Sequence, residues 1–164
     1  MDRYKDKALV LHRYGSRYTF FVFSFAVVLL LYWMKEFEDA LIFLLTFTAT
    51  MGAVVILKLA FRVPRPEGSD LENGSYAFPS GHATGIFFLV VTISHLAYTH
   101  LSSLWFSLIL ITLLAASVLV SLSRIILNVH TKIQVITGAL IGFLIPLIIL
   151  SNKESILSYI LSIL

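Results

Sequence analysis

The sequence predicts an all-α protein whose helices form a multi-pass transmembrane bundle. Of its 164 residues, 59% are hydrophobic and 13% are charged, whereas a soluble domain carries about 25% charged residues. The mean hydropathy of +0.93 indicates more apolar surface than one water-exposed core can bury. The apolar residues also gather in runs close to the roughly 20 residues that a helix needs to cross a bilayer. We therefore expect a single domain over residues 1–164, with five to six membrane helices.

Five apolar runs approach the length of a membrane span. They cover residues 18–34, 40–61, 81–98, 104–122 and 131–150. Before them, residues 1–17 mix apolar side chains with five basic residues, which is typical of an amphipathic segment at the membrane surface. The tail 155–164 is apolar but too short to cross alone, so it is expected to lie in the interface or to pack as a half-span.

The connection 62–79 differs from the other turns because it holds three of the four prolines together with two glycines. It is therefore expected to be a loop with fixed bends. Because successive spans alternate in direction, this loop, the N-terminus and the turn 123–130 should share one membrane face. Nearly every polar residue of interest falls on that face, so the functional site is expected there. His95 and His100 belong to the opposite face, and no role is predicted for them.

Three basic residues mark the predicted site face. Lys58 ends the second run, Arg65 stands between two prolines, and Arg124 ends the fourth run. Arginine presents a planar fork to two phosphate oxygens, and lysine adds a point charge. Each residue also has a simpler interpretation. A lysine at a helix end reaches toward water, and an arginine there often anchors the helix at the interface. An arginine in a loop, such as Arg65, can simply be solvated or contact lipid headgroups.

The segment Pro79-Ser80-Gly81-His82 opens the third run, and Ser80 is a candidate helix N-cap. The first amides of a helix bind anions well, and Gly81 lets a ligand approach the backbone closely. A plain capped helix would explain these residues too. His82 and His130 favour an anion site, because one histidine can attack phosphorus while the other protonates the leaving oxygen.

The acidic residues argue against metal chemistry at this face. None of the nine Asp and Glu lies between Asn73 and Lys153, so the carboxylates that a magnesium site normally uses are missing near His82 and His130. A zinc site would need a third ligand that is hard to name. We therefore predict a reaction without a metal or other cofactor. The net charge of +3 reflects a basic N-terminus rather than the basic stripe of a nucleic-acid binder.

These residues resemble the signature of the type 2 phosphatidic acid phosphatase superfamily, which has the form K-x6-R-P, P-S-G-H and S-R-x5-H-x3-D. The three parts occur in order within residues 58–66, 79–82 and 123–130, and the match extends over 58–142. The resemblance implies a metal-independent membrane lipid phosphatase in which His130 forms a phosphohistidine and His82 is the general acid. It also implies a phosphate-binding set of Lys58, Arg65, Ser80, Gly81 and Arg124.

The third motif departs from the pattern at its last position, where Gln134 stands in place of aspartate. Positions i and i+4 of a helix face each other, so Gln134 can accept the ring N–H of His130 without supplying a charge. Gln134 is therefore predicted to orient the histidine, and the missing charge is expected to slow the reaction. The segment 130–135 resembles the branch that acts on dolichyl-type diphosphates, which mildly favours a polyprenyl diphosphate substrate.

The expected function is hydrolysis of a phosphomonoester or diphosphate of a lipid. The candidate substrates are of the polyprenyl diphosphate, phosphatidate, phosphatidylglycerophosphate and lipid A types. The alternative is a catalytically weak or silent protein that binds or transports lipid phosphates, which Gln134 alone suggests. The expected partners are the lipid substrate and the bilayer, with no nucleic acid. The cell membrane of a bacterium or archaeon is the expected location, and the side that the site faces and the oligomeric state stay open.

Overall fold

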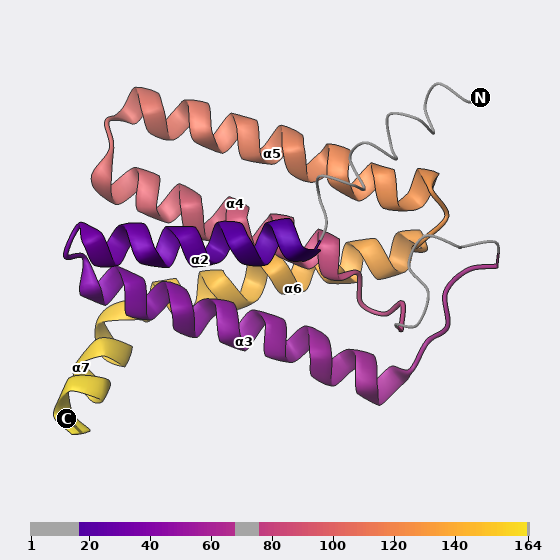
Figure 1. Ribbon diagram of the computed structural model, residues 1–164, viewed down its shortest axis with the longest axis horizontal. Coiled ribbons are helices and arrows are strands. Elements are labelled where there is room, and N and C mark those ends of the chain that lie inside the picture. The colour runs from indigo at the N-terminus through magenta and orange to yellow at the C-terminus, as the bar shows by residue number, and fades with distance from the viewer. Residues whose placement is uncertain (1–16, 68–75, 164) are drawn as a thin grey trace.

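The computed structural model describes residues 17–67 and 76–163, and every regular element in these ranges is an α-helix. The helices are α2 Arg17–Trp33, α3 Phe37–Phe61, α4 Gly81–His100, α5 Ser103–Ile126, α6 Lys132–Ser151 and α7 Lys153–Ile163. Helices α2 to α6 run alongside one another, and α7 turns away from them at one end (Figure 1). The predicted all-α helical bundle is confirmed. The amphipathic segment expected at 1–17 lies, apart from Arg17, outside the described residues.

Four of the described helices, α3, α4, α5 and α6, are long and apolar enough to cross a membrane. At 1.5 Å per residue their 20 to 25 residues extend about 30–37 Å, which matches the hydrocarbon core of a bilayer. Helix α2 is also apolar but has 17 residues. The outward faces carry exposed large apolar side chains such as Val22, Ile56 and Ile133, which fits a bundle whose solvent is lipid.

Helix α4 is the centre of the bundle and contacts α2, α3, α5 and α6. Its fully buried Phe88 is surrounded by the rings of Phe20, Phe43 and Phe47, whose centroids lie 5.3–5.8 Å away in edge-to-face geometry. Each such pair contributes about 0.5–1.5 kcal/mol beyond the burial of apolar area. The ring cluster therefore fixes α2 and α3 against α4.

Two glycines let α6 lie directly against the backbone of α4. A methyl group added to Gly138 would collide with the carbonyl oxygen of Ser80, and one added to Gly142 would collide with the carbonyl of Thr84. Small residues at a helix contact allow this close approach and are common between membrane helices. Because α4 and α6 point in the same direction (Figure 1), the contact brings their two N-termini together at one end of the bundle.

The opposite end of the bundle holds a polar cluster that the sequence did not reveal. The carboxylate of Asp39, which is 7% exposed, accepts hydrogen bonds from His100 Nε2 at 2.7 Å and from Lys153 Nζ at 2.6 Å. The cluster ties α3 to the end of α4 and to the start of α7. His100, for which no role was predicted, is therefore a structural contact, formed because antiparallel helices bring the start of α3 beside the end of α4.

Replacing Asp39 with asparagine should lower the thermal stability of the protein. The substitution removes the charge from two charge-assisted hydrogen bonds, each worth about 1.5–3 kcal/mol, and leaves Lys153 without its carboxylate partner. The change is measured as a lower Tm in detergent. Glu38→Gln removes a carboxylate from the exposed neighbouring position and should leave the Tm unchanged. Equal shifts in the two variants would contradict a structural role for the Asp39 cluster.

Candidate functional site

The predicted site residues lie at the end of the bundle where α3 and α5 end and where α4 and α6 begin (Figure 1). Lys58 lies in the last turn of α3, and Arg124 lies in the last turn of α5. Ser80 is the N-cap of α4, and His82 lies in the first turn of that helix. His130 directly precedes Thr131, the N-cap of α6. The shared face that alternating spans predicted is therefore confirmed for these segments.

A backbone hydrogen bond joins the starts of α4 and α6. The amide of Ser80 donates to the carbonyl of Gln134 at 3.0 Å, while the carbonyl of Ser80 accepts from the amide and the hydroxyl of Thr84. Ser80 occupies the N-cap position that the sequence predicted, but its hydroxyl makes no capping hydrogen bond. The hydroxyl is buried, and no described residue hydrogen-bonds to it. A buried donor at a helix N-terminus is well suited to an anion.

The ring of His130 is held between a carboxamide and a guanidinium group. Its Nδ1 lies 3.2 Å from Gln134 Oε1, and its Nε2 lies 3.4 Å from Arg65 Nη1. The amide of Thr131 also donates to Gln134 Oε1 at 3.0 Å, which fixes the orientation of the carboxamide. Since Oε1 can only accept and a guanidinium can only donate, Nδ1 carries the proton and Nε2 carries the lone pair. This is the tautomer that a nucleophilic Nε2 requires.

Gln134 has three structural functions at the start of α6. Its side chain accepts from His130 and from the amide of Thr131, its own amide donates to the Thr131 hydroxyl at 3.3 Å, and its carbonyl binds Ser80. The reciprocal bonds with Thr131 form a capping box, which fixes the N-terminus of α6. Thr131 was not among the predicted site residues, although the spacing Thr-x-x-Gln is a recognisable signal for this cap.

Arg124 is completely buried beside the turn that carries His130. Its Nε donates to the hydroxyl of Ser123 at 3.1 Å, and its carbonyl accepts the amides of Val129 and His130, both at 3.2 Å. An arginine that only anchors a helix at the interface would extend into the headgroup region. Burial of a guanidinium is costly unless polar or anionic groups surround it, so the position of Arg124 favours the anion-binding interpretation.

Hydrogen bonds join the two described ends of the connection 62–79 to each other and to the site. Lys58 Nζ donates to the carbonyl of Tyr76, and the amide of Ala77 donates to the carbonyl of Val63 at 2.8 Å. Arg65 Nη1 donates to the carbonyl of Val129 at 3.0 Å. Lys58 is therefore directed toward the segment that leads into Ser80. This contact distinguishes it from a lysine that merely reaches into water.

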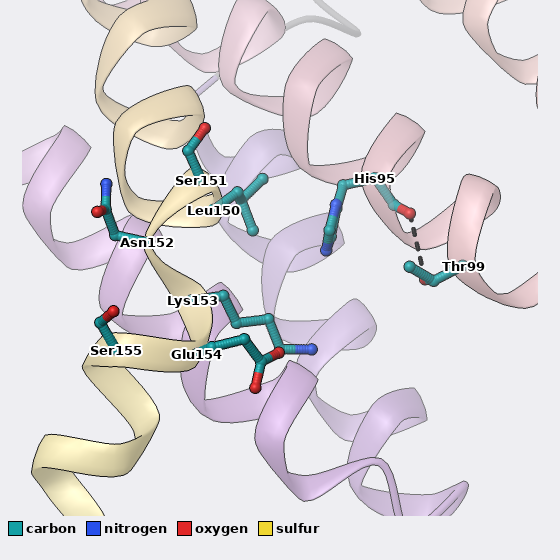
Figure 2. A pocket seen from close by; sticks show the side chains of 8 residues that line it. All are labelled: His95, Thr99, Leu150, Ser151, Asn152, Lys153, Glu154 and Ser155. Carbon is teal, nitrogen blue, oxygen red and sulfur yellow. Dashed lines mark hydrogen bonds between the residues drawn. The ribbon is translucent and has the colours of Figure 1, made fainter.

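A cavity and a possible set of cation ligands lie at the other end of the bundle. A cavity of about 260 Å³ is lined by His95, Thr99 and residues 150–155 (Figure 2). Among the described residues, the grouping of histidine and carboxylates that could hold a cation is Glu36, Asp39 and His100. Lys153 already neutralises Asp39 there. Neither feature adjoins the starts of α4 and α6, so neither bears on the phosphate site that the sequence predicts.

Comparison with known proteins identifies the family. The model of the PAP2 superfamily matches residues 39–155, a range that contains all of the predicted site residues. The chain belongs to the PAP2 superfamily. The fold of this PAP2 protein is similar to the crystal structure of a transmembrane PAP2-type phosphatidylglycerolphosphate phosphatase from Bacillus subtilis. The TM-score is 0.81 and the identity is 23%, with 93% of this chain and 77% of the other chain covered. Among curated proteins, no match is found.

The resemblance that the three motifs indicated is therefore confirmed at the level of the PAP2 family and fold. Together with four long apolar helices, the match identifies an integral membrane protein. Membership of the PAP2 superfamily supports a membrane lipid phosphatase. The catalytic and phosphate-binding roles of the individual residues stay predictions.

Proposed function

We propose that this PAP2 protein hydrolyses the phosphomonoester or diphosphate of a membrane lipid through a phosphohistidine, without a metal. The observation that carries the proposal is the junction of α4 and α6, where Gln134 holds the ring of His130 and binds the backbone of Ser80. Through Gln134, this junction links the ring that would supply the nucleophilic Nε2 to the residue whose buried hydroxyl lies at a helix N-terminus. It lies at one end of the bundle, at the level where the headgroup of a bilayer lipid would reach it.

In the proposed reaction, the lone pair of His130 Nε2 attacks phosphorus while the bond from phosphorus to the lipid oxygen breaks. His82 gives its proton to that leaving oxygen and then, as a base, takes a proton from the water that hydrolyses the phosphohistidine. Inorganic phosphate is released and His130 is regenerated. The charge that develops on the other phosphate oxygens is stabilised by the predicted binding set of Lys58, Arg65, Ser80, the Gly81 amide and Arg124.

Polyprenyl diphosphates are the substrates that the sequence favours within this class, because of the segment 130–135. The fold relative from Bacillus subtilis is described as a phosphatidylglycerolphosphate phosphatase, which supports keeping phosphatidylglycerophosphate among the candidates. Phosphatidate and lipid A types complete the set to be tested. Lys58, Arg65 and Arg124 would hold the phosphate of any of these lipids. Selectivity among the substrates would therefore depend on contacts with the rest of the lipid.

The proposal is tested by assaying the purified protein in detergent, with a chelator present, against a panel of these lipid phosphates. We expect inorganic phosphate from at least one lipid, and a covalent phosphoryl label that acid removes and alkali does not. Binding of lipid phosphates without turnover would instead favour the silent binding or transport protein. A requirement for added divalent metal would overturn the metal-independent reaction.

Two substitutions of Gln134 should separate two effects on kcat: that of its hydrogen-bond acceptor, and that of the negative charge which an aspartate at this position would supply. Gln134→Met keeps the approximate shape but cannot accept from His130 or Thr131, so kcat should fall by about 10-fold or more as the ring loses its orientation. Gln134→Glu keeps an acceptor and adds the charge that stabilises a cationic ring, so its kcat should equal or exceed that of the native protein. A native kcat in Gln134→Met would contradict the proposal that Gln134 orients the His130 ring.

A further inference from the structure

Asn128 lies in the turn between α5 and α6 and makes a contact that the proposed reaction does not use. Its φ is 54°, in the left-handed region, which asparagine adopts more readily than most residues other than glycine. Its amide donates to the carbonyl of Ile125 at 3.0 Å, which closes the turn. Its side chain contacts the connection 62–79, where Nδ2 donates to the carbonyl of Glu67 at 2.8 Å.

A hydrogen bond from Arg65 joins the same two parts of the chain, residues 65–67 (the Arg65 segment) and the α5–α6 turn. Arg65 Nη1 donates to the carbonyl of Val129 at 3.0 Å and lies 3.4 Å from His130 Nε2. Glu67 follows Arg65 by two residues, and Asn128 directly precedes Val129. The two hydrogen bonds therefore join the same two short segments, and both segments carry residues of the proposed site.

The two hydrogen bonds should respond differently when a phosphate binds. The donors of Arg65 would be recruited by phosphate oxygens, which weakens the hydrogen bond between Arg65 and Val129. The hydrogen bond from Asn128 to Glu67 involves no group that the phosphate would contact. It can therefore keep the backbone of the Arg65 segment against the turn while the guanidinium is engaged.

We propose that Asn128 is a positioning residue, whose carboxamide holds the Arg65 segment so that the guanidinium is directed toward the phosphate beside His130. The inference rests on the proposed function, because it assigns Arg65 and His130 to one phosphate site. Asn128 itself contacts neither the phosphate nor the reacting atoms. Substituting Asn128 should therefore weaken phosphate affinity, and it should do so only while Arg65 is present.

Two substitutions remove the donor while tolerating the backbone conformation. Asn128→Gly accepts a positive φ without strain, and Asn128→Asp keeps the size but directs a carboxylate oxygen at the carbonyl of Glu67. Loss of one hydrogen bond should raise KM, and the Kd for orthovanadate measured by calorimetry in detergent, by about 2- to 10-fold, with a smaller change in kcat. Asn152→Gly is the matched control. It removes a similar bond, from Asn152 Nδ2 to Ile148 at 2.8 Å, at the far end of the bundle, and should change neither constant.

A double-mutant cycle with Arg65→Ala tests whether Asn128 acts through Arg65. In the Arg65→Ala background, Asn128→Gly should have no further effect on vanadate affinity, because the group that it positions is gone. Additive effects of the two substitutions would overturn the positioning role and indicate a general stabilisation of the turn. The Tm of each variant, measured alongside, identifies any loss of affinity that comes from unfolding.

Vanadate binding keeps this inference separable from the proposed function. If the native protein hydrolyses lipid phosphates and Asn128→Gly leaves KM and vanadate affinity unchanged, the inference is overturned and the function stands. If the native protein binds vanadate without releasing phosphate from any lipid, and Asn128→Gly weakens that binding, the function is overturned and the inference stands. If the native protein neither binds vanadate nor releases phosphate, both are overturned.

Discussion

Replacing His130 with alanine should reduce kcat for phosphate release from a lipid by roughly 10⁴-fold or more, because the proposed covalent mechanism would lose its nucleophile. The hydrogen-bond partners of His130 favour the tautomer that the proposed reaction needs, because Nδ1 lies 3.2 Å from Gln134 Oε1 and Nε2 lies 3.4 Å from Arg65 Nη1. The rate is measured as inorganic phosphate released in detergent with a chelator present. The phosphoryl label on the protein should disappear together with the turnover.

His95 provides the matched control, since it is a histidine near the opposite end of α4 that lines a separate cavity. His95→Ala should keep native turnover, whereas His130→Ala should lose it while retaining a Tm near that of the native protein. Retention of more than a tenth of the native rate by His130→Ala would rule out His130 as the nucleophile. Loss of rate in both variants would mean that histidine substitutions disturb the fold rather than the chemistry.

Replacing Gly142 with alanine should destabilise the bundle and abolish most of the activity. The added methyl group would meet the backbone of Thr84, with its carbonyl carbon and Cα both at 2.9 Å, and backbone atoms cannot move aside as a flexible side chain can. Overpacking of this kind costs about 1–3 kcal/mol, and more where relief is difficult. Helix α6 would have to retreat from α4, which stretches the bond from Ser80 to Gln134 and displaces His130. The measurements are Tm and kcat in detergent.

Gly52 is the matched control for this substitution. It lies within α3, and a methyl group there would have no heavy atom within 4 Å. Alanine is favoured over glycine inside a helix by about 0.8–1.0 kcal/mol, so Gly52→Ala should leave the Tm unchanged or raise it. Native Tm and kcat in Gly142→Ala would show that the close contact between α4 and α6 is not needed to hold the two helix starts together.

Much of the fold follows from local properties of the sequence. The runs 40–61 and 131–150 became α3 and α6 with boundaries within three residues of those expected, because hydropathy is a local property. Prolines shortly after residue 61 also prevent α3 from continuing, whereas α6 continues through Pro146. The motif residues were placed on one end of the bundle by counting spans alone. Gln134 was predicted to accept from His130 because the two residues are four positions apart, and the structure shows that contact. His130 precedes the N-cap Thr131, so the capping turn of α6, and not a turn of the helix itself, brings the two side chains together.

Other features depend on residues far apart in the chain, and tertiary structure alone decided them. Ser80 was identified as an N-cap, but only the contact of α4 with α6 leaves its hydroxyl buried and available. The pairing of Asp39 with His100 and Lys153, and that of Asn128 with Glu67, join segments about 60 or more residues apart. The sequence by itself determined the helices, their order and the chemistry of the motifs. The partners of the polar groups were decided by which distant segments the fold brings together. For Ser80 and Gln134 this is the close approach of the α4 and α6 backbones at Gly138 and Gly142, which no local pattern shows.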